Sequence, residues 1–248
     1  MEEVTVRFME TTEVKADILV EGLPGIGQVG KLVAEYMIEV LGAEKIAEIH
    51  SAYFPPQVII DSEGITHLVN NELYLSEEDG RRIVFLVGDH QSTTGEGHYV
   101  LCQSYLDIAE HMGVHRIYTL GGYGVGHLVD NPRVLGAVNM LRLRDEAEAM
   151  GVTFHREEGI GGIIGASGLL LALGAMRNIE GICLMGETSG YLVDPKSASK
   201  VLSVLSKLLG ISIDATALQD RAAEMEQVIE ELREVERGKM QDELTYIG

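Results

Sequence analysis

The sequence is poor in basic residues, and this shortage excludes whole classes of partner. Lysine and arginine number 19 against 39 aspartates and glutamates, which gives a net charge of −20 at pH 7. Binding to a phosphate backbone or to an anionic membrane surface requires clustered cations. We therefore expect no nucleic-acid partner and no membrane partner.

Cysteine and long apolar runs are also scarce. Only Cys102 and Cys183 occur, both inside apolar segments and in no disulfide or metal-binding pattern. The first 15 residues lack the basic and apolar regions of a signal peptide, and no apolar stretch reaches about 18 residues. These features predict a soluble protein of a reducing compartment, the cytoplasm.

Glycine, in contrast, is abundant, with 29 of 248 residues in clusters between apolar runs. Strand-like and helical runs alternate between these clusters, which is typical of an α/β domain. We predict an α/β fold with three layers, α/β/α, and a mostly parallel sheet, with a mixed or antiparallel part between residues 45 and 75. The helices are expected at 28–41, 98–112, 140–150, 163–176 and 195–209, and the clearest strands at 16–21, 82–87, 116–120, 133–138, 152–155 and 179–185.

The composition changes after residue 213. Residues 214–248 hold ten acidic and four basic residues, with apolar side chains at heptad spacing. We predict a globular domain at 1–213 and a C-terminal amphipathic helix and tail at 214–248. The apolar seam packs either on the domain or on a neighbouring chain, and we expect a homo-oligomer. The seam consists of Leu218, Ala222, Met225, Ile229 and Leu232.

The last residues turn apolar again after a charged run at 237–243. Leu244, Tyr246, Ile247 and Gly248 form a tip suited to insertion into a partner. The alternative is a frayed terminus without a partner. Both interpretations remain open from the pattern alone.

Two segments carry weak signals of enzymatic chemistry. Gly25, Gly27 and Gly30 form a GxGxxG turn between a predicted strand and a predicted helix, the context of a dinucleotide-binding site. Pro24 removes one N–H from this turn, and the next strand ends in His50 where an acidic residue would bind a ribose. We therefore predict a packing turn and no cofactor.

The second segment is the loop from Asp89 to His98, which follows a central strand. Asp89, His90 and Ser92 lie where α/β enzymes place their sites, but the histidine spacing matches no compact zinc site. The alternative is that Asp89, Ser92, Thr93 and Thr94 cap the loop and the helix that begins near Gly97. We predict no catalytic residue and no metal, and keep Asp89, His90, Gly25 and Gly27 as the candidate pocket.

Five glycine-centred blocks occur in order, at 21–30 (EGLPGIGQVG), 88–91 (GDHQ), 121–124 (GGYG), 159–165 (GIGGIIG) and 186–190 (GETSG). With these blocks the chain resembles the archaeal proteasome assembly chaperone family, over about residues 14 to 213. The resemblance implies an α/β/α fold like that of nucleoside phosphorylases and hydrolases, without their activity. It also implies oligomers that bind the proteasome core particle.

The resemblance further implies a carboxyl-terminal tail that docks between α subunits of the core particle through a penultimate tyrosine. Here Tyr246 is third from the end, so the tail departs from that motif by one place. We interpret the protein as a non-enzymatic proteasome assembly chaperone or core-particle-binding factor. The alternative is a hydrolase or nucleoside-phosphorylase-like enzyme that uses the Asp89–His98 loop.

Overall fold

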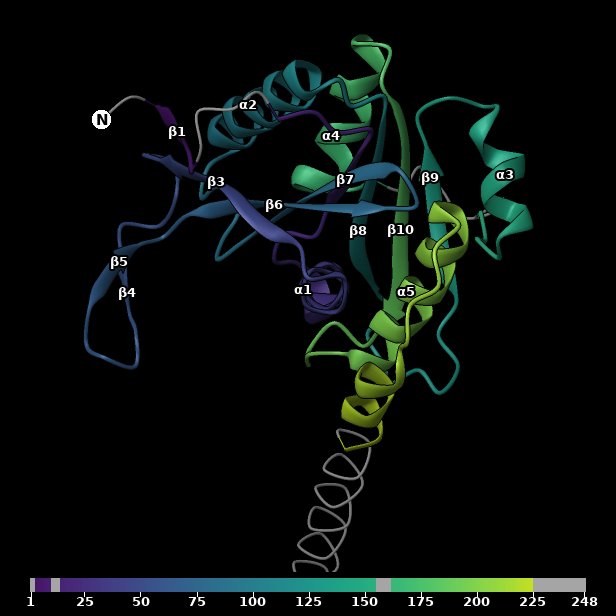
Figure 1. The fold of residues 1–248 in the computed structure, drawn as a ribbon. Coiled ribbons are helices and arrows are strands. Elements are labelled where there is room, and N and C mark those ends of the chain that lie inside the picture. Colours follow the sequence, from purple (N-terminus) through teal and green to yellow (C-terminus); the bar gives the residue numbers. More distant parts are fainter. Residues whose placement is uncertain (1–2, 10–13, 155–161, 225–248) are drawn as a thin grey trace, which may run out of the picture.

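The chain forms a large mixed sheet with helices on both faces (Figure 1). This computed structural model describes residues 3–9, 14–154 and 162–224. The strands are β1 (Val4–Phe8), β2 (Ile18–Glu21), β3 (Glu44–Ser51), β4 (Val58–Ile60), β5 (Thr66–Leu68), β6 (Asn71–Glu78), β7 (Arg81–Gly88), β8 (Arg116–Gly124), β9 (Val134–Val138) and β10 (Glu180–Thr188). The helices are η1 (Ile26–Gln28), α1 (Val29–Leu41), α2 (Gly95–Met112), α3 (Leu143–Ala149), α4 (Ala166–Met176) and α5 (Pro195–Leu209).

The main sheet has the strand order β1-β3-β6-β7-β2-β8-β10-β9. Its four adjacent strands β7, β2, β8 and β10 are parallel, and the remaining four pairings are antiparallel. The antiparallel or mixed part expected at 45–75 is present, because β3 and β6 pair antiparallel to each other. The two-residue turn at Asp79 and Gly80, both with positive φ, joins β6 and β7 as an antiparallel hairpin. The antiparallel pairing of β1 with β3 and of β9 with β10, at the two edges of the sheet, was not expected.

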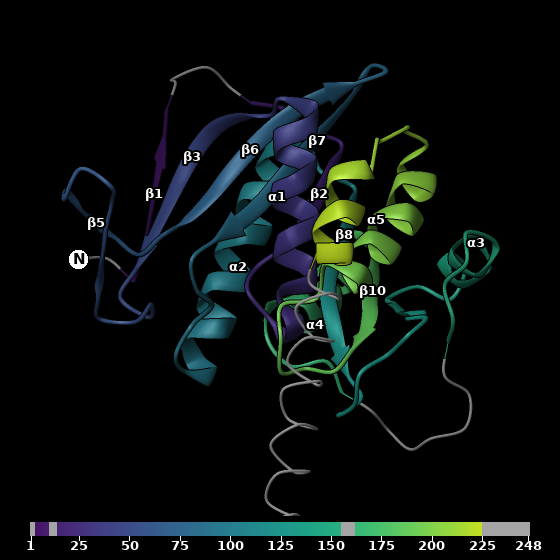
Figure 2. The same cartoon turned by 90° about the horizontal axis from the view of Figure 1, so that it is seen from below.

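The helices cover both faces, so the three-layer arrangement is as expected. Ile18 and Val20 of β2 point into the core under α1 and α5, whereas Leu19 points into the core under α2 and α4. This alternation follows from the two-residue period of a strand. Figures 1 and 2 show α1 and α5 on one side of the sheet and α2 and α4 on the other.

Helix ends are well determined by the sequence. The helix expected at 195–209 has those bounds as α5, because the Asp194 carboxylate accepts a hydrogen bond of 2.9 Å from the Ser197 N–H and Gly210 ends the helix with a left-handed φ of 65°. Pro195 occupies the first turn, where no N–H is needed. No helix within the described residues is long and apolar enough to cross a membrane.

Two strands differ from expectation. β1 was not predicted, although Val4 to Phe8 pair along β3 from Ser51 to Ala47. Its five residues alternate too briefly to stand out from a polar amino terminus. The strand expected at 152–155 makes a single bridge, Thr153 to Leu135, within the described residues, and His155 lies outside them.

Candidate functional site

The glycine-rich turn is packed against the ends of two strands. Gly27 has a left-handed φ of 62°, and a Cβ at this position would lie 2.9 Å from Thr188 Oγ1. A Cβ on Gly30 would lie 2.7 Å from the carbonyl carbon of Leu120 and closer still to its oxygen. The Gly27 carbonyl also accepts a hydrogen bond of 2.9 Å from the Asp194 N–H. These glycines are explained by close packing, while Gly25 is exposed.

The side chains of the Asp89–His98 loop make local hydrogen bonds. Asp89 Oδ2 accepts from the Asn70 N–H at 3.4 Å, and His90 Nε2 lies 2.9 Å from Gln57 Nε2. Thr94 accepts a hydrogen bond of 3.0 Å from the Gly97 N–H and caps α2, as the capping interpretation predicts. The partners of Asp89 and His90 are thus on different segments.

Gln91, which the sequence analysis overlooked, connects the two parts of the candidate pocket. Its Nε2 donates to the Pro24 carbonyl at 2.8 Å, and its Oε1 accepts from the Ala166 N–H at 2.9 Å. The same amide therefore links the glycine-rich turn, the Asp89 loop and the start of α4. Gln91 has a positioning role, because its amide nitrogen and its amide oxygen both form hydrogen bonds with backbone groups.

The second overlooked residue is Glu21, at the end of β2. Its side chain is fully buried and accepts hydrogen bonds from the Leu23 N–H at 3.1 Å and from Ser167 Oγ at 2.9 Å. Burial raises the pKa of Glu21 from 4.5 to about 7, and the two hydrogen bonds limit that rise. The only signal in the sequence is an acidic residue directly after the apolar run Ile18–Val20.

Neither cysteine is suited to nucleophilic catalysis. Cys102 and Cys183 are buried, and desolvation raises the pKa of each thiol to about 12. Across the described residues, no cluster of three or more histidine, cysteine, aspartate or glutamate side chains is arranged to hold a metal ion.

The geometry of the glycine-rich turn leads to a testable expectation about nucleotides. We expect NAD, FAD and ATP to give no saturable binding by calorimetry at a Kd tighter than about 10 µM, which corresponds to roughly 7 kcal/mol. The reason is that Gly27, the second glycine of the motif, lies against Thr188, whereas a dinucleotide site needs open backbone there for the pyrophosphate. Saturable binding that disappears in Gly27→Val would contradict this and support an enzyme.

Exposed apolar residues define two surfaces of another kind. The first, the hairpin surface, is the separate β4–β5 hairpin, which stands away from the body of the domain (Figure 1). Val58, Ile60 and Ile65 are 52%, 66% and 53% exposed. A two-stranded hairpin is at best marginally stable alone, so an apolar hairpin exposed on both faces favours contact with a partner. The hairpin surface consists of Val58, Ile59, Ile60, Ile65 and Leu68.

The second, the strand-end surface, lies where β8 and β10 end. Tyr191 is 80% exposed, and the Ile26 side chain lies against Gly124 and Gly190. The Val125 N–H donates to the Thr188 carbonyl at 2.9 Å and holds the two strand ends together. The strand-end surface consists of Ile26, Tyr123, Tyr191, Leu192 and Val193.

The C-terminal seam begins on the domain itself. Residues 216–224 are helical, and Leu218 and Ala222 are buried. Leu218 belongs to the core under α1 and α5, and the Tyr36 hydroxyl donates to the Asp214 carbonyl. The seam residues Met225, Ile229 and Leu232 and the tip residues Leu244, Tyr246, Ile247 and Gly248 lie outside the described residues. Their roles, and the division at residue 213, stay predictions.

Comparison with known proteins gives one family and several similar structures. Residues 19–233 match the PAC2 family. The uncharacterized protein MJ1210 of Methanocaldococcus jannaschii is 38% identical over 240 residues, covering 93% of this chain and 92% of that protein.

Two similar crystal structures come from Pyrococcus furiosus. PbaB, an archaeal proteasome activator, is 39% identical, with a TM-score of 0.88 over 94% of this chain and 100% of that chain. PbaA, an archaeal homolog of proteasome-assembly chaperone, is 25% identical, with a TM-score of 0.79 over 99% of this chain and 98% of that chain.

Proposed function

The chain belongs to the PAC2 family, and from this premise we propose that it is a non-enzymatic, proteasome-associated binding protein. One observation carries the proposal: the chain is 39% identical to the proteasome activator PbaB, with a TM-score of 0.88 over the whole of that chain. The likeness to PbaA, a homolog of proteasome-assembly chaperone, points to the same cellular machine.

The site geometry supports a binding role over the rival enzyme. Gly27 packs against Thr188, and Gly30 packs against Leu120. The Gln91 side chain accepts a hydrogen bond from the Ala166 N–H and donates one to the Pro24 carbonyl, so it links its own loop to the glycine-rich turn. Asp89 and His90 are hydrogen-bonded to different segments, whereas an acid–base pair requires both groups to meet at one reacting atom. We propose that this region positions elements and carries no catalysis.

We propose that the partner is the α-subunit surface of the proteasome core particle, in the cytoplasm, and that the protein acts as a homo-oligomer. Tyr246 and Ile247 in the tip at 244–248 supply large apolar side chains beyond a charged run. The hairpin surface supplies a second apolar contact on the globular domain. A few well-packed residues near the centre of an interface, tyrosine among them, contribute most of the binding energy.

Deleting residues 246–248 tests the tip directly. Full burial of a Tyr and an Ile in partner pockets contributes about 1.5–3 kcal/mol each, so we expect capture of core-particle α subunits in a pull-down to weaken by more than about tenfold. The melting temperature should not change, because chain ends outside the core contribute little to stability.

A matched variant separates the tip from the globular domain. Ile60→Glu with Ile65→Glu places two charges on the hairpin surface and leaves the tip intact. Equal capture by the deleted and the full-length protein, with loss only in the hairpin variant, would assign the contact to the hairpin. No capture by the full-length protein would refute the proposed function.

A second measurement separates an activator from an assembly chaperone. An activator raises the rate at which an assembled core particle hydrolyses a fluorogenic peptide, whereas an assembly chaperone acts on unassembled α subunits. The sequence identity to PbaB is greater than that to PbaA, and this favours the activator role. We therefore expect full-length protein to raise peptide hydrolysis, and the deletion of 246–248 to abolish that rise.

A further inference from the structure

The outer face of α5 is a local exception to the acidic character of this chain. Residues 195–213 contain three lysines and no acidic residue, although the whole chain has a net charge of −20 at pH 7. Lys200 and Lys207 are exposed, and neither makes an ion pair with any residue that the structure describes. The lysines at 196, 200 and 207 recur at four and seven residues, so they share one face of the helix.

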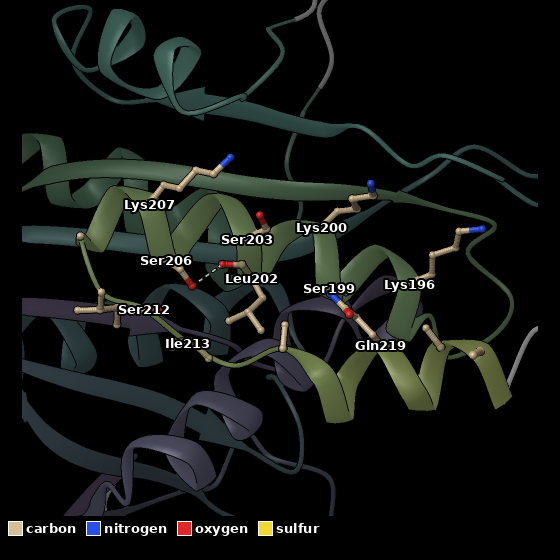
Figure 3. Close-up of a pocket in the computed structure, with 15 residues that line it drawn as sticks. Lys196, Ser199, Lys200, Leu202, Ser203, Ser206, Lys207, Ser212, Ile213 and Gln219 are labelled. Carbon is tan, nitrogen blue, oxygen red and sulfur yellow. Dashed lines mark hydrogen bonds between the residues drawn. The ribbon is translucent and has the colours of Figure 1, made fainter.

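A groove of about 880 Å³ lies beside this face, between α5 and residues 210–223, and the three lysines line its outer edge (Figure 3). Figure 3 shows Ser199 and Gln219 pointing toward one another between the two helices and the lysines along the opposite edge of α5. The described lining contains no carboxylate, no arginine and no aromatic ring. It combines the three lysines with Ser199, Ser203, Ser206, Ser212 and Gln219 and with an apolar floor that includes Leu202, Ile211 and Ile213.

We propose that this groove binds the acidic segment 226–236 of a second copy of the chain. The segment has the sequence EQVIEELREVE, with five glutamates and one arginine, and so carries the opposite charge to the groove. Glu226, Glu230 and Glu234 recur every four residues in the sequence, the same interval that separates Lys196 from Lys200.

The chain's connectivity favours a second copy over the same chain. Residues 216–224 form one wall of the groove and lead directly to residue 226. A return of 226–236 into that groove would require a tight reversal, and reversals are dominated by glycine, proline, asparagine, aspartate and serine. Residues 221–236 contain none of these. This inference rests on the homo-oligomer of the proposed function, but it is independent of the proposed proteasome contact, because the described residues that line the groove fall within 196–223, whereas that contact is proposed for the tip at 244–248.

The test is the self-association of the full-length protein, measured by analytical ultracentrifugation. We expect Lys200→Glu with Lys207→Glu to weaken self-association by at least about tenfold, because like charges then face each other across the interface. Raising the salt concentration from about 0.05 to about 0.5 M should weaken self-association of the unaltered protein, because screening shortens the reach of charge attraction.

Two further variants make the result decisive. Arg7→Glu with Lys31→Glu changes the net charge equally but on β1 and α1, and should leave self-association unchanged. Glu226→Lys with Glu230→Lys should weaken self-association alone and associate again when mixed with Lys200→Glu/Lys207→Glu. Melting curves establish that each variant is folded.

Three outcomes would overturn the proposal. The first is a monomer of unaltered protein at about 100 µM and low salt. The second is equal weakening by the groove variant and by the Arg7/Lys31 control, which would indicate a general charge effect. The third is failure of the two charge-reversed proteins to associate with each other. Proteasome capture is measured in parallel and should persist in a groove variant, so failure of one proposal is distinguishable from failure of the other.

Discussion

Replacing Gly30 with alanine should lower the free energy of unfolding by about 3 kcal/mol or more. Gly30 lies in the first turn of α1, and an added Cβ would stand 2.7 Å from the carbonyl carbon of Leu120 in β8. The Gly30 carbonyl in turn lies against Gly22, so α1 is closely packed at this residue on two sides. Because the backbone of a strand deforms little, α1 has to move away from the sheet to accommodate the added Cβ.

The matched control is Gly25→Ala in the same turn. Gly25 is exposed, its φ of −159° is extended backbone, and the nearest atom to an added Cβ is the Leu23 oxygen at 4.0 Å. We expect a change within about 0.5 kcal/mol. Urea unfolding of both variants at one pH is the measurement. Equal stability of the two would show that the glycine spacing does not arise from packing and would reopen the nucleotide-binding interpretation.

Glu21→Gln should raise the stability of the protein at pH 8 by up to about 3 kcal/mol. The folded-state pKa of Glu21 is raised to about 7, above its ordinary value of 4.5, so the folded protein holds the proton more tightly than the unfolded chain. The contribution of Glu21 to the free energy of unfolding is fully present below pH 4.5 and is lost as the pH rises to about 7. A shift of this size corresponds to about 3 kcal/mol.

Glutamine keeps the essential hydrogen bonds of this site without the buried charge. Its oxygen accepts from the Leu23 N–H, and its amide nitrogen can donate to the hydroxyl oxygen of Ser167. The measurement is urea unfolding between pH 5 and 8 for the unaltered protein, Glu21→Gln and the exposed control Glu63→Gln. A pH profile of Glu21→Gln parallel to that of the unaltered protein would refute the assignment of this pH dependence to Glu21.

The sequence alone determined the local structure because local structure depends on neighbouring residues. Asp194, Pro195 and Gly210 fix both ends of α5, and the two-residue alternation of β2 divides its side chains between two cores. The same patterns established the α/β class and three layers. They also indicated an antiparallel or mixed part at 45–75, but not the antiparallel pairing of β1 with β3 and of β9 with β10 at the two edges, because that pairing depends on how distant segments meet in space.

The candidate site depended on tertiary structure to a greater degree. The GxGxxG spacing of Gly25 to Gly30 is the same for a nucleotide site and for a packed turn, and only the position of Thr188 against Gly27 distinguishes them. Glu21 is visible in the sequence as a charge after an apolar strand, but its hydrogen-bond partner Ser167 in α4 lies 146 residues away along the chain. The sequence thus specifies which groups exist and which local geometry they adopt, whereas solvent exclusion and close contact arise only when distant segments pack together.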